Sequence, residues 1–449
     1  MLYYAKNNTK VQESPLESDY NFSCKLTELF FNNDNIKEEL KMKTASGFKK
    51  VMLIVSLLLL NIVEQAASAI SASIPQMAAS FPQHSEVQIE LVTTVVSISV
   101  TIFVLVSGLV IKKIGQKQTA ILGLVIASVA SIVPAFSNSF NVIMISRVVL
   151  GIGIGLVNPL AISLIGEFFH GDTLASLMGW RTAVASIGVS VMTFLAGQLL
   201  KINWHASYLV YLLFIPALIL FFFFVPSPEK MVAEQETENK DGKKESEETN
   251  TEPATENGHS SLLIVIGLSL LLMVYMACAM ISYIKMALMY IQTGIGSPSQ
   301  ASTVISVLGF AQLIGGALFG LTYKKLHRNV LPLGVGLSGI LMVLMTFTKS
   351  NGMIMLLGGL SGLFGGLAVP YIFTRISQVS NTKTAPLHNA FALVGSNLGS
   401  FVAPILASVL GATAVLSLRN AGYVIVALAV IVLVVFIFDS QKTKAPSAD

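Results

Sequence analysis

Charged side chains are scarce in this sequence of 449 residues: they make up 12% of it, whereas hydrophobic residues make up 53%. Ordinary globular domains carry roughly 25% charged residues. Seventeen of the 24 acidic residues lie in two polar stretches, residues 1–50 and 226–260. The long apolar blocks 51–225 and 261–438 hold only five carboxylates, Glu64, Glu86, Glu90, Glu167 and Asp172. A soluble domain of this size could not cover itself with so little charge, so the sequence predicts a polytopic membrane protein and excludes a water-soluble enzyme.

Residues that carry redox, metal or nucleotide chemistry are also few. Cys24 lies in a polar tail and Cys278 in an apolar run, which predicts neither a disulfide nor a metal site. The six histidines show no HExxH spacing, and no Walker GxxxxGK[ST] sequence occurs. The basic residues are dispersed, so no nucleic-acid partner is expected. The sequence therefore predicts no cofactor, and a proton gradient as the energy source.

Twelve apolar runs are long enough to cross a membrane, which takes about 20 residues. They are too long and too free of polar alternation for strands, so an all-α membrane protein is predicted. Their approximate ranges are 50–75, 91–111, 118–136, 142–168, 174–200, 206–225, 261–291, 300–322, 330–348, 353–376, 386–412 and 417–438.

The distribution of lysine and arginine predicts the orientation of these helices. With the N-terminus inside the cell, twelve basic residues flank the cytoplasmic helix ends and three flank the outer ends. Both termini are therefore expected in the cytoplasm. Residues 226–260 contain ten acids and no apolar periodicity, which favours a disordered linker between two six-helix bundles. The expected domains are an N-terminal extension (1–47), a bundle (48–225), the linker (226–260), a second bundle (261–440) and a tail (441–449).

Two motifs recur at nearly the same offset in the two halves. Gly151, Gly155 and Pro159 form GxxxGLxxP in helix 4, and Gly362, Gly366 and Pro370 form the same pattern 211 residues later in helix 10. The run 108–113, GLVIKK, ends helix 2, and the run 320–325, GLTYKK, ends helix 8. Two matches in equivalent helices indicate homologous halves, although small residues are common wherever membrane helices pack closely.

These features resemble the major facilitator superfamily over about residues 48–440. The resemblance implies two pseudo-symmetric six-helix bundles and alternating access between them. The family signature after helix 2 is represented by Gly108, Lys112, Lys113 and Gly115. Lys112 replaces the usual aspartate, so the cytoplasmic lock that this aspartate forms in the family is not expected here. Together with the glycines and prolines of the repeated GxxxGLxxP motif, these residues are the predicted gating motifs.

The polar residues of helix 1 include its one carboxylate, Glu64. Asn61, Glu64, Ser68 and Ser71 share one helix face, and a charge at that depth usually faces a cavity or a partner. Glu64 is the predicted proton-coupling group, and a structural carboxylate is the alternative. Arg147 is the second predicted coupling residue, because the resemblance implies this role for the helix 4 arginine. The alternative is that Arg147 satisfies backbone carbonyls of helix 1.

Lys285 has three possible roles: binding an anionic substrate, pairing with Glu64, or reaching the outer interface. Asn397 in helix 11 could bind substrate, although close helix packing explains its neighbourhood equally well. Arg181 and Arg375 are expected to be cytoplasmic anchors. The predicted substrate-cavity residues are Asn61, Gln65, Ser68, Tyr275, Ser282, Lys285 and Asn397.

The sequence thus predicts a monomeric secondary transporter of the cytoplasmic membrane, whose partners are the lipid bilayer, protons and a small molecule. Proton-coupled export of a small amphiphilic compound is the favoured activity. The alternatives are uptake of a metabolite, possibly anionic, and a transport-inactive sensor or scaffold.

Overall fold

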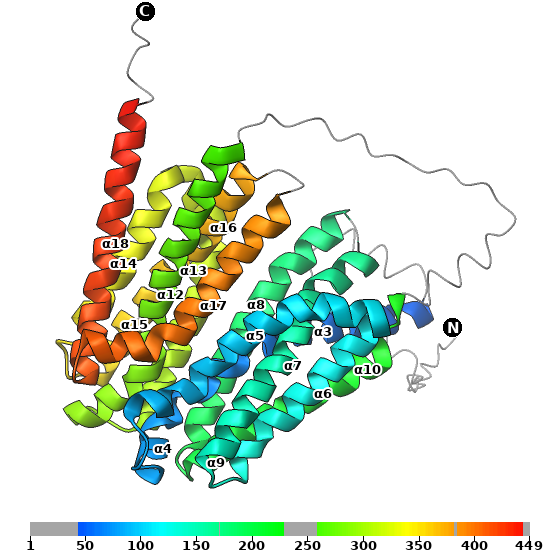
Figure 1. The fold of residues 1–449 in the computed structure, drawn as a ribbon, viewed down its shortest axis with the longest axis horizontal. Coiled ribbons are helices and arrows are strands. Elements are labelled where there is room, and N and C mark those ends of the chain that lie inside the picture. The colour runs from blue at the N-terminus through cyan, green and yellow to red at the C-terminus, as the bar shows by residue number, and fades with distance from the viewer. Residues whose placement is uncertain (1–43, 170, 229–257, 381–383, 443–449) are drawn as a thin grey trace, which may run out of the picture.

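The structure is a computed structural model that describes residues 44–169, 171–228, 258–380 and 384–442, and the regular elements among these residues are helices, with no strand. Most of the predicted extension, linker and tail lies outside this described part. The first half contains α3 (Thr44–Gln65), η1 (Ala66–Ser73), α4 (Ile74–Ser80), α5 (Glu86–Ile114), α6 (Gln116–Ile132), η2 (Val133–Ala135), α7 (Phe140–Phe168), α8 (Gly171–Leu199), α9 (Trp204–Ser207), η3 (Tyr208–Leu213) and α10 (Phe214–Phe224). The second half contains α12 (Gly258–Thr293), α13 (Pro298–Leu326), η4 (His327–Asn329), α14 (Val330–Met345), α15 (Asn351–Gly365), α16 (Ala368–Val379), α17 (Ala385–Leu410) and α18 (Ala414–Lys442). Figure 1 shows the two halves as bundles side by side.

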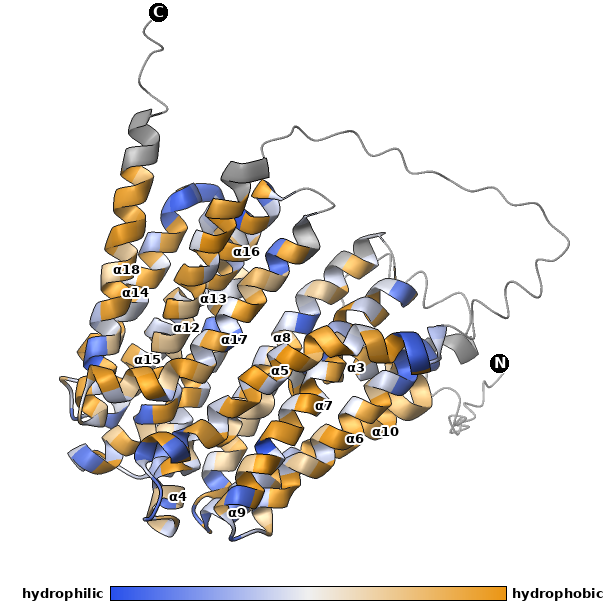
Figure 2. Cartoon of the chain, viewed as in Figure 1, coloured by the Kyte–Doolittle hydropathy of each residue, from blue (hydrophilic) through white to orange (hydrophobic). Residues whose placement is uncertain are grey.

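The described helices agree with the twelve predicted crossings. Ten helical stretches are long and apolar enough to cross a membrane, and α3 with η1 and α4 adds a bent one, at 45°. One of the ten, Pro298–Met345, holds both α13 and α14, which the sequence predicted as separate crossings. Apolar residues cover the helix faces, and polar residues gather toward the helix ends (Figure 2). The protein is therefore a multi-pass membrane protein built from helices.

One predicted boundary is wrong in a way that matters for the site. Helix 2 was expected to begin at residue 91, but α5 begins at Glu86. Ser85 and Gln88 form a reciprocal capping box, in which the Ser85 Oγ accepts from the Gln88 backbone N–H at 3.3 Å. Capping residues are polar, so a search for apolar runs places the helix start too late. Because α5 begins at residue 86, Glu86 and Glu90 both belong to this helix.

The repeated glycines hold neighbouring helices close together in both halves. A Cβ on Gly151 of α7 would lie 2.5 Å from the Ser99 Cβ of α5. A Cβ on Gly362 of α15 would lie 2.1 Å from the Leu308 carbonyl oxygen of α13. The equivalent helix pairs of the two halves thus touch through equivalent glycines, which supports the internal repeat.

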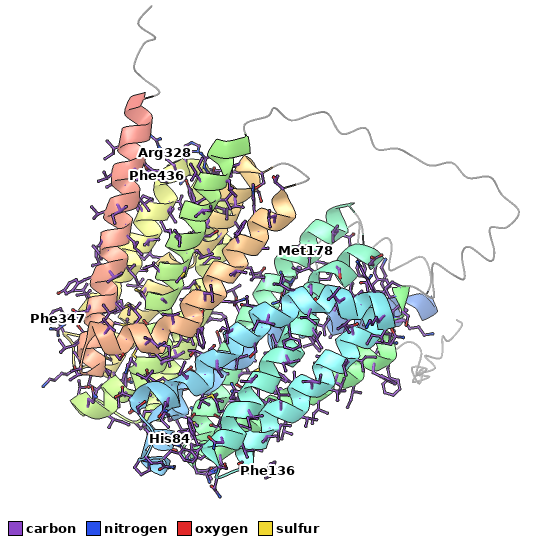
Figure 3. The ribbon with its side chains drawn as sticks, in the orientation of Figure 1. His84, Phe136, Met178, Arg328, Phe347 and Phe436 are labelled. Atoms are coloured by element: carbon purple, nitrogen blue, oxygen red, sulfur yellow. The ribbon has the colours of Figure 1, made fainter. Side chains whose placement is uncertain are left out.

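The two ends of the molecule can be named from the loops that lie there. We call the end with loops 81–85, 200–203 and 294–297 the outer end and the opposite one the cytoplasmic end, because the basic residues predict these two sides. His84 and Phe136 lie at this end, whereas Arg328 and Phe436 lie at the opposite one (Figure 3). The two bundles converge toward the outer end, near α4, and diverge toward the end of α16 (Figure 1).

The orientation is testable by cysteine labelling of intact cells. Gln83 and Gln378 are both exposed, one in an outer loop and one near the cytoplasmic end of α16. We expect Gln83→Cys to react with a membrane-impermeant maleimide from outside and Gln378→Cys to react only after the cells are permeabilised. The reverse pattern would invert the predicted topology.

Candidate outer gate between the two bundles

The outer halves of α8 and α13 form one contact between the bundles. The Ser302 hydroxyl of α13 donates to the Thr193 carbonyl of α8, and Gly197 lies against the same serine. Ser299, in the first turn of α13, is buried there. Small residues on both helices allow this close approach.

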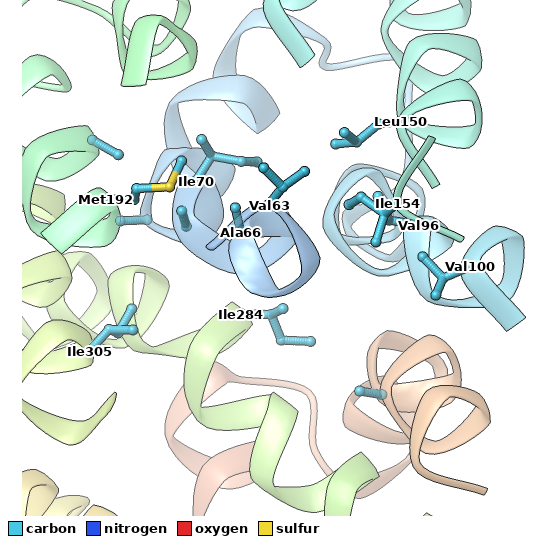
Figure 4. Packing of buried hydrophobic residues seen from close by; sticks show 14 of the residues in the cluster. Val63, Ala66, Ile70, Val96, Val100, Leu150, Ile154, Met192, Ile284 and Ile305 are labelled. Atoms are coloured by element: carbon cyan, nitrogen blue, oxygen red, sulfur yellow. The ribbon is translucent and has the colours of Figure 1, made fainter. Parts of the chain in front are cut away.

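A second contact joins α12 to the first half. Ile284 of α12 lies opposite Val63 and Ala66, at the junction of α3 and η1 (Figure 4). Ile284, Val63 and Ala66 are all fully buried. These apolar contacts exclude water from the interface beside the next residue of α12, Lys285.

Lys285 makes an ion cluster with two glutamates of α5. Its Nζ contacts Glu86 Oε1 and lies 2.7 Å from Glu90 Oε1. Glu86 and Glu90 are four residues apart, so both face the lysine from one side of the helix. The side chains of Glu90 and Lys285 are 0% and 5% exposed, whereas that of Glu86 is 47% exposed. The cluster therefore joins the two bundles near the outer end and is largely shielded from water.

This cluster revises the predictions for Lys285. A lysine that is 5% exposed and paired with two glutamates is not placed at the outer interface, and its roles in substrate binding and in pairing with Glu64 stay predictions. Its contacts are Glu86 and Glu90, which precede the predicted start of helix 2 at residue 91. Two signals could have identified them: the Ser85–Gln88 capping box and the i, i+4 spacing of the glutamates. The pairing with a lysine about 199 residues away was not visible in the sequence.

Arg147 is fully buried, and its partners all belong to the first bundle. Its Nε donates to the Val92 carbonyl of α5 at 3.1 Å, and its Nη2 donates to the Ala67 carbonyl of η1 at 2.9 Å. Nη2 also donates to the Tyr211 hydroxyl, and the guanidinium lies over the rings of Tyr208 and Tyr211. This geometry matches the predicted alternative, in which Arg147 satisfies carbonyls of helix 1. Its role in proton coupling stays a prediction.

The Ala66 and Ala67 carbonyls that Tyr211 and Arg147 bind lie in η1, where helix 1 changes from α-helical to 3₁₀ winding. The serines of η1 bond backward to carbonyls three residues away, as in Ser71 to Ser68 at 2.6 Å and Ser73 to Ile70 at 2.7 Å. Such local bonds compete with α-helical ones. The Tyr211 hydroxyl donates to the Ala66 carbonyl at 3.1 Å. The side chains of α7 and η3 thus stabilise the 3₁₀ segment.

The predicted polar face of helix 1 is placed only in part. Asn61 is buried and accepts a hydrogen bond from the Arg181 Nε of α8, while its amide donates to the Leu57 and Leu58 carbonyls. Arg181 therefore reaches the inside of the bundle rather than serving only as a cytoplasmic anchor. Ser68 is half-buried. The side chains of Glu64 and Gln65 lie outside the described residues.

Tyr275 and Ser282 line a small cavity inside the second bundle, of about 40 Å³. The Tyr275 hydroxyl donates to the Gly365 carbonyl at 3.3 Å, and Ser361 donates to the Ser338 carbonyl at 3.0 Å. A cavity of this size holds a few water molecules. Asn397 is half-buried on α17 and is not among the lining residues. The structure thus brings together two of the predicted substrate-cavity residues, but not Asn397.

The predicted gating motif after helix 2 lies at the cytoplasmic end of α5. Lys112 and Lys113 are exposed in the last turn, and Gly115 ends the helix with a φ of 87°, a conformation that favours glycine. A Cβ on Gly108 would have no heavy atom within 4 Å. Pro159 lies within the continuous α7, whereas Pro370 lies in α16, after a break that follows α15.

Comparisons with known proteins agree with this architecture. The sequence profile of the Major Facilitator Superfamily matches residues 56–285 and 268–449. The chain is 26% identical over 361 residues to the 3-(3-hydroxy-phenyl)propionate transporter of Escherichia coli (strain K12), which covers 77% of this chain and 83% of that protein.

Solved transporter structures share the fold at low sequence identity. A bacterial homolog of the human lysosomal transporter Spinster, in an inward-facing and occupied conformation, superposes with a TM-score of 0.67 at 13% identity and covers 89% of this chain and 99% of that one. A peptide transporter POT in complex with alafosfalin superposes with a TM-score of 0.66 at 12% identity, covering 85% and 93%. The chain therefore belongs to the Major Facilitator Superfamily and is a secondary transporter rather than an enzyme.

Proposed function

We propose that this protein takes up a small amphiphilic organic acid across the cell membrane by alternating access, together with protons. The observation that carries the proposal is the similarity to a transporter of 3-(3-hydroxy-phenyl)propionate over most of both chains. That compound joins a hydroxylated aromatic ring to a carboxylate, so it is a small amphiphilic anion. The substrate class expected from the sequence, a small amphiphilic compound, includes such acids.

The charge of the substrate decides between uptake and export. The inside-negative membrane potential opposes the entry of an anion by about 2.3 kcal/mol per charge per 100 mV. The same potential drives an anion out of the cell, so export of an acid needs no proton. Uptake does need coupling, and we therefore favour uptake over the export expected from the sequence.

The closed outer end supports alternating access as the mechanism. The α8–α13 contact and the ion cluster of Lys285 hold the bundles together at that end. Drug-sized sites measure about 300–1,000 Å³, so the 40 Å³ cavity of the second bundle cannot by itself hold an aromatic acid. The substrate site is therefore expected between the bundles, with Tyr275 and Ser282 close to its wall.

Transport into proteoliposomes tests this proposal. With an interior one pH unit more alkaline, we expect 3-phenylpropionate-type acids to accumulate about tenfold per coupled proton, and a protonophore to abolish the accumulation. Neutral and cationic amphiphiles of the same size, and protein-free liposomes, serve as controls. Transport of the cations without the acids would reject the substrate class, and counterflow of no compound would favour the sensor or scaffold.

A further inference from the structure

The ion cluster of Lys285 and the α8–α13 contact together form the interface that we call the outer gate. In this cluster the negative charges outnumber the positive ones. Two carboxylates, Glu86 and Glu90, share one ammonium group, Lys285. With all three groups ionised the cluster carries one net negative charge. Glu86 is 47% exposed and can be hydrated, but Glu90 is fully buried. The excess charge would therefore lie on a carboxylate without water.

Apart from the shared Lys285, the described surroundings of Glu90 supply no donor to an ionised carboxylate. Although the Lys285 Nζ lies 2.7 Å from Oε1, neither oxygen of Glu90 accepts a hydrogen bond of good geometry from any described residue. The neighbouring hydroxyl of Thr93 donates to the Glu90 backbone carbonyl instead of to the carboxylate. A buried carboxylate whose one cationic partner is shared with a second carboxylate is costly to ionise, whereas a protonated carboxyl is neutral. One proton on Glu90 leaves Lys285 paired with Glu86 and the cluster without net charge.

Among the described residues of the elements packed against the cluster, no second cation pairs with Glu90 in place of the proton. η1 and α4 contain no titratable side chain. The charged residue of α7 nearest to the cluster, Arg147, is committed to Val92, Ala67 and Tyr211. Toward the outer end, His84 stacks on Phe140, Tyr290 bonds to Asn351 and Arg419 bonds to Thr346. Farther along the packed helices, Tyr283 bonds to Gln312, Tyr275 to Gly365 and His388 to Ser380, while Cys278 is buried and Tyr423 is exposed. The other titratable groups described in these helices lie toward the cytoplasmic end, and they are Lys112, Lys113, Lys117, Glu167, Tyr323, Lys324, Lys325, Tyr371 and Arg375.

We propose that Glu90 binds one proton from the outer side when the outer gate closes. The glutamates belong to one bundle and the lysine to the other, so the cluster exists only while the outer ends are together. Opening the gate exposes Glu90 to water, where a carboxylate is readily ionised. Closing the gate buries it, and the proton is taken up with the substrate. This assignment rests on the proposed proton-coupled uptake and places its proton site at Glu90 rather than at Glu64.

A cysteine at Ser299 reports gate closure without any substrate. Ser299 is 6% exposed at the α8–α13 contact and becomes accessible only when that contact opens. In a protein with Cys24→Ser and Cys278→Ala, the rate of labelling of Ser299→Cys by an impermeant maleimide is divided by that of Gln83→Cys, which is always exposed. This ratio cancels the effect of pH on thiol reactivity itself.

We expect the labelling ratio to rise several-fold as the external pH is raised from about 5 to about 8. Glu90→Gln should hold the ratio low and constant with pH, because glutamine stays neutral and Lys285 keeps Glu86 as a partner. The variant Glu86→Gln, one turn away on the same helix, should shift the pH dependence to lower pH, because Glu90 then becomes the only carboxylate beside Lys285 and the closed cluster is neutral without the proton. A ratio that does not change with pH in the unsubstituted cluster would overturn the proposal without any variant at residue 90. A pH dependence unchanged by Glu90→Gln would do the same.

Transport separates this proposal from the proposed function. Glu90→Gln should keep counterflow within about twofold but lose accumulation driven by a pH gradient. Glu64→Gln should then keep accumulation, and loss of accumulation in Glu64→Gln alone would return the proton site to helix 1. If no acid is transported by the unsubstituted protein, the proposed substrate fails, while the labelling ratio still decides whether Glu90 binds the proton of the gate.

Discussion

Replacing Arg147 with methionine is expected to lower the free energy of unfolding by about 3–5 kcal/mol. The side chain is fully buried and donates to carbonyls of two different elements, Val92 of α5 and Ala67 of η1. Methionine retains the apolar stem but leaves these carbonyls unsatisfied, at about 1–3 kcal/mol each. The contacts of the guanidinium with the rings of Tyr208 and Tyr211 are lost as well.

A thermal unfolding curve of the purified protein measures this effect. We expect the melting temperature to fall by about 10 °C, since each kcal/mol shifts it by about 2–4 °C in domains of 150–250 residues. Arg147→Lys should also be destabilised, because one ammonium group does not reproduce the fixed arrangement of donors with which the guanidinium reaches Val92 and Ala67 together. The control is Arg375→Met, whose side chain is exposed and bonds to Gln378 at 3.3 Å. A normal melting temperature for Arg147→Met together with lost transport would assign Arg147 a role in coupling alone.

The crossings and the internal repeat could be predicted because they depend on local composition. A helix that faces lipid must be apolar over about 20 residues, and this requirement is visible in any window of the sequence. The glycines of the repeat are visible for a similar reason: Gly155 and Gly362 stand where two helix backbones meet, and larger residues do not fit there.

The gate could not be predicted in the same way because its parts come from distant segments. Glu90 lies before the apolar run of its helix, so composition alone placed it before the predicted helix start. Its partner Lys285 is on α12, and nothing in either segment specifies that they meet. Arg181 likewise lies near a helix end in the sequence, yet the packing of α8 brings its guanidinium to Asn61. The contacts that join the bundles thus depend on tertiary packing.

Replacing Gly362 with alanine is expected to destabilise the second bundle, although alanine is the better helix former. In an exposed helix this substitution would stabilise by about 1 kcal/mol. Here the added Cβ would lie 2.1 Å from the Leu308 carbonyl oxygen, so α15 and α13 must move apart. Overpacking of this kind costs about 1–3 kcal/mol or more, which reverses the sign of the substitution. Gly155→Ala should have the same effect between α7 and α5.

Two glycines of the same repeat provide the matched controls. A Cβ on Gly108 or Gly320 would meet no heavy atom within 4 Å, and both residues lie inside long helices. Gly108→Ala and Gly320→Ala should therefore leave the melting temperature unchanged or raise it, while Gly155→Ala and Gly362→Ala lower it. Equal melting temperatures for all four variants would contradict the packing role of the repeat. A fully stable Gly108→Ala protein with reduced transport would show that this glycine serves a conformation in which the cytoplasmic end of α5 meets a neighbour.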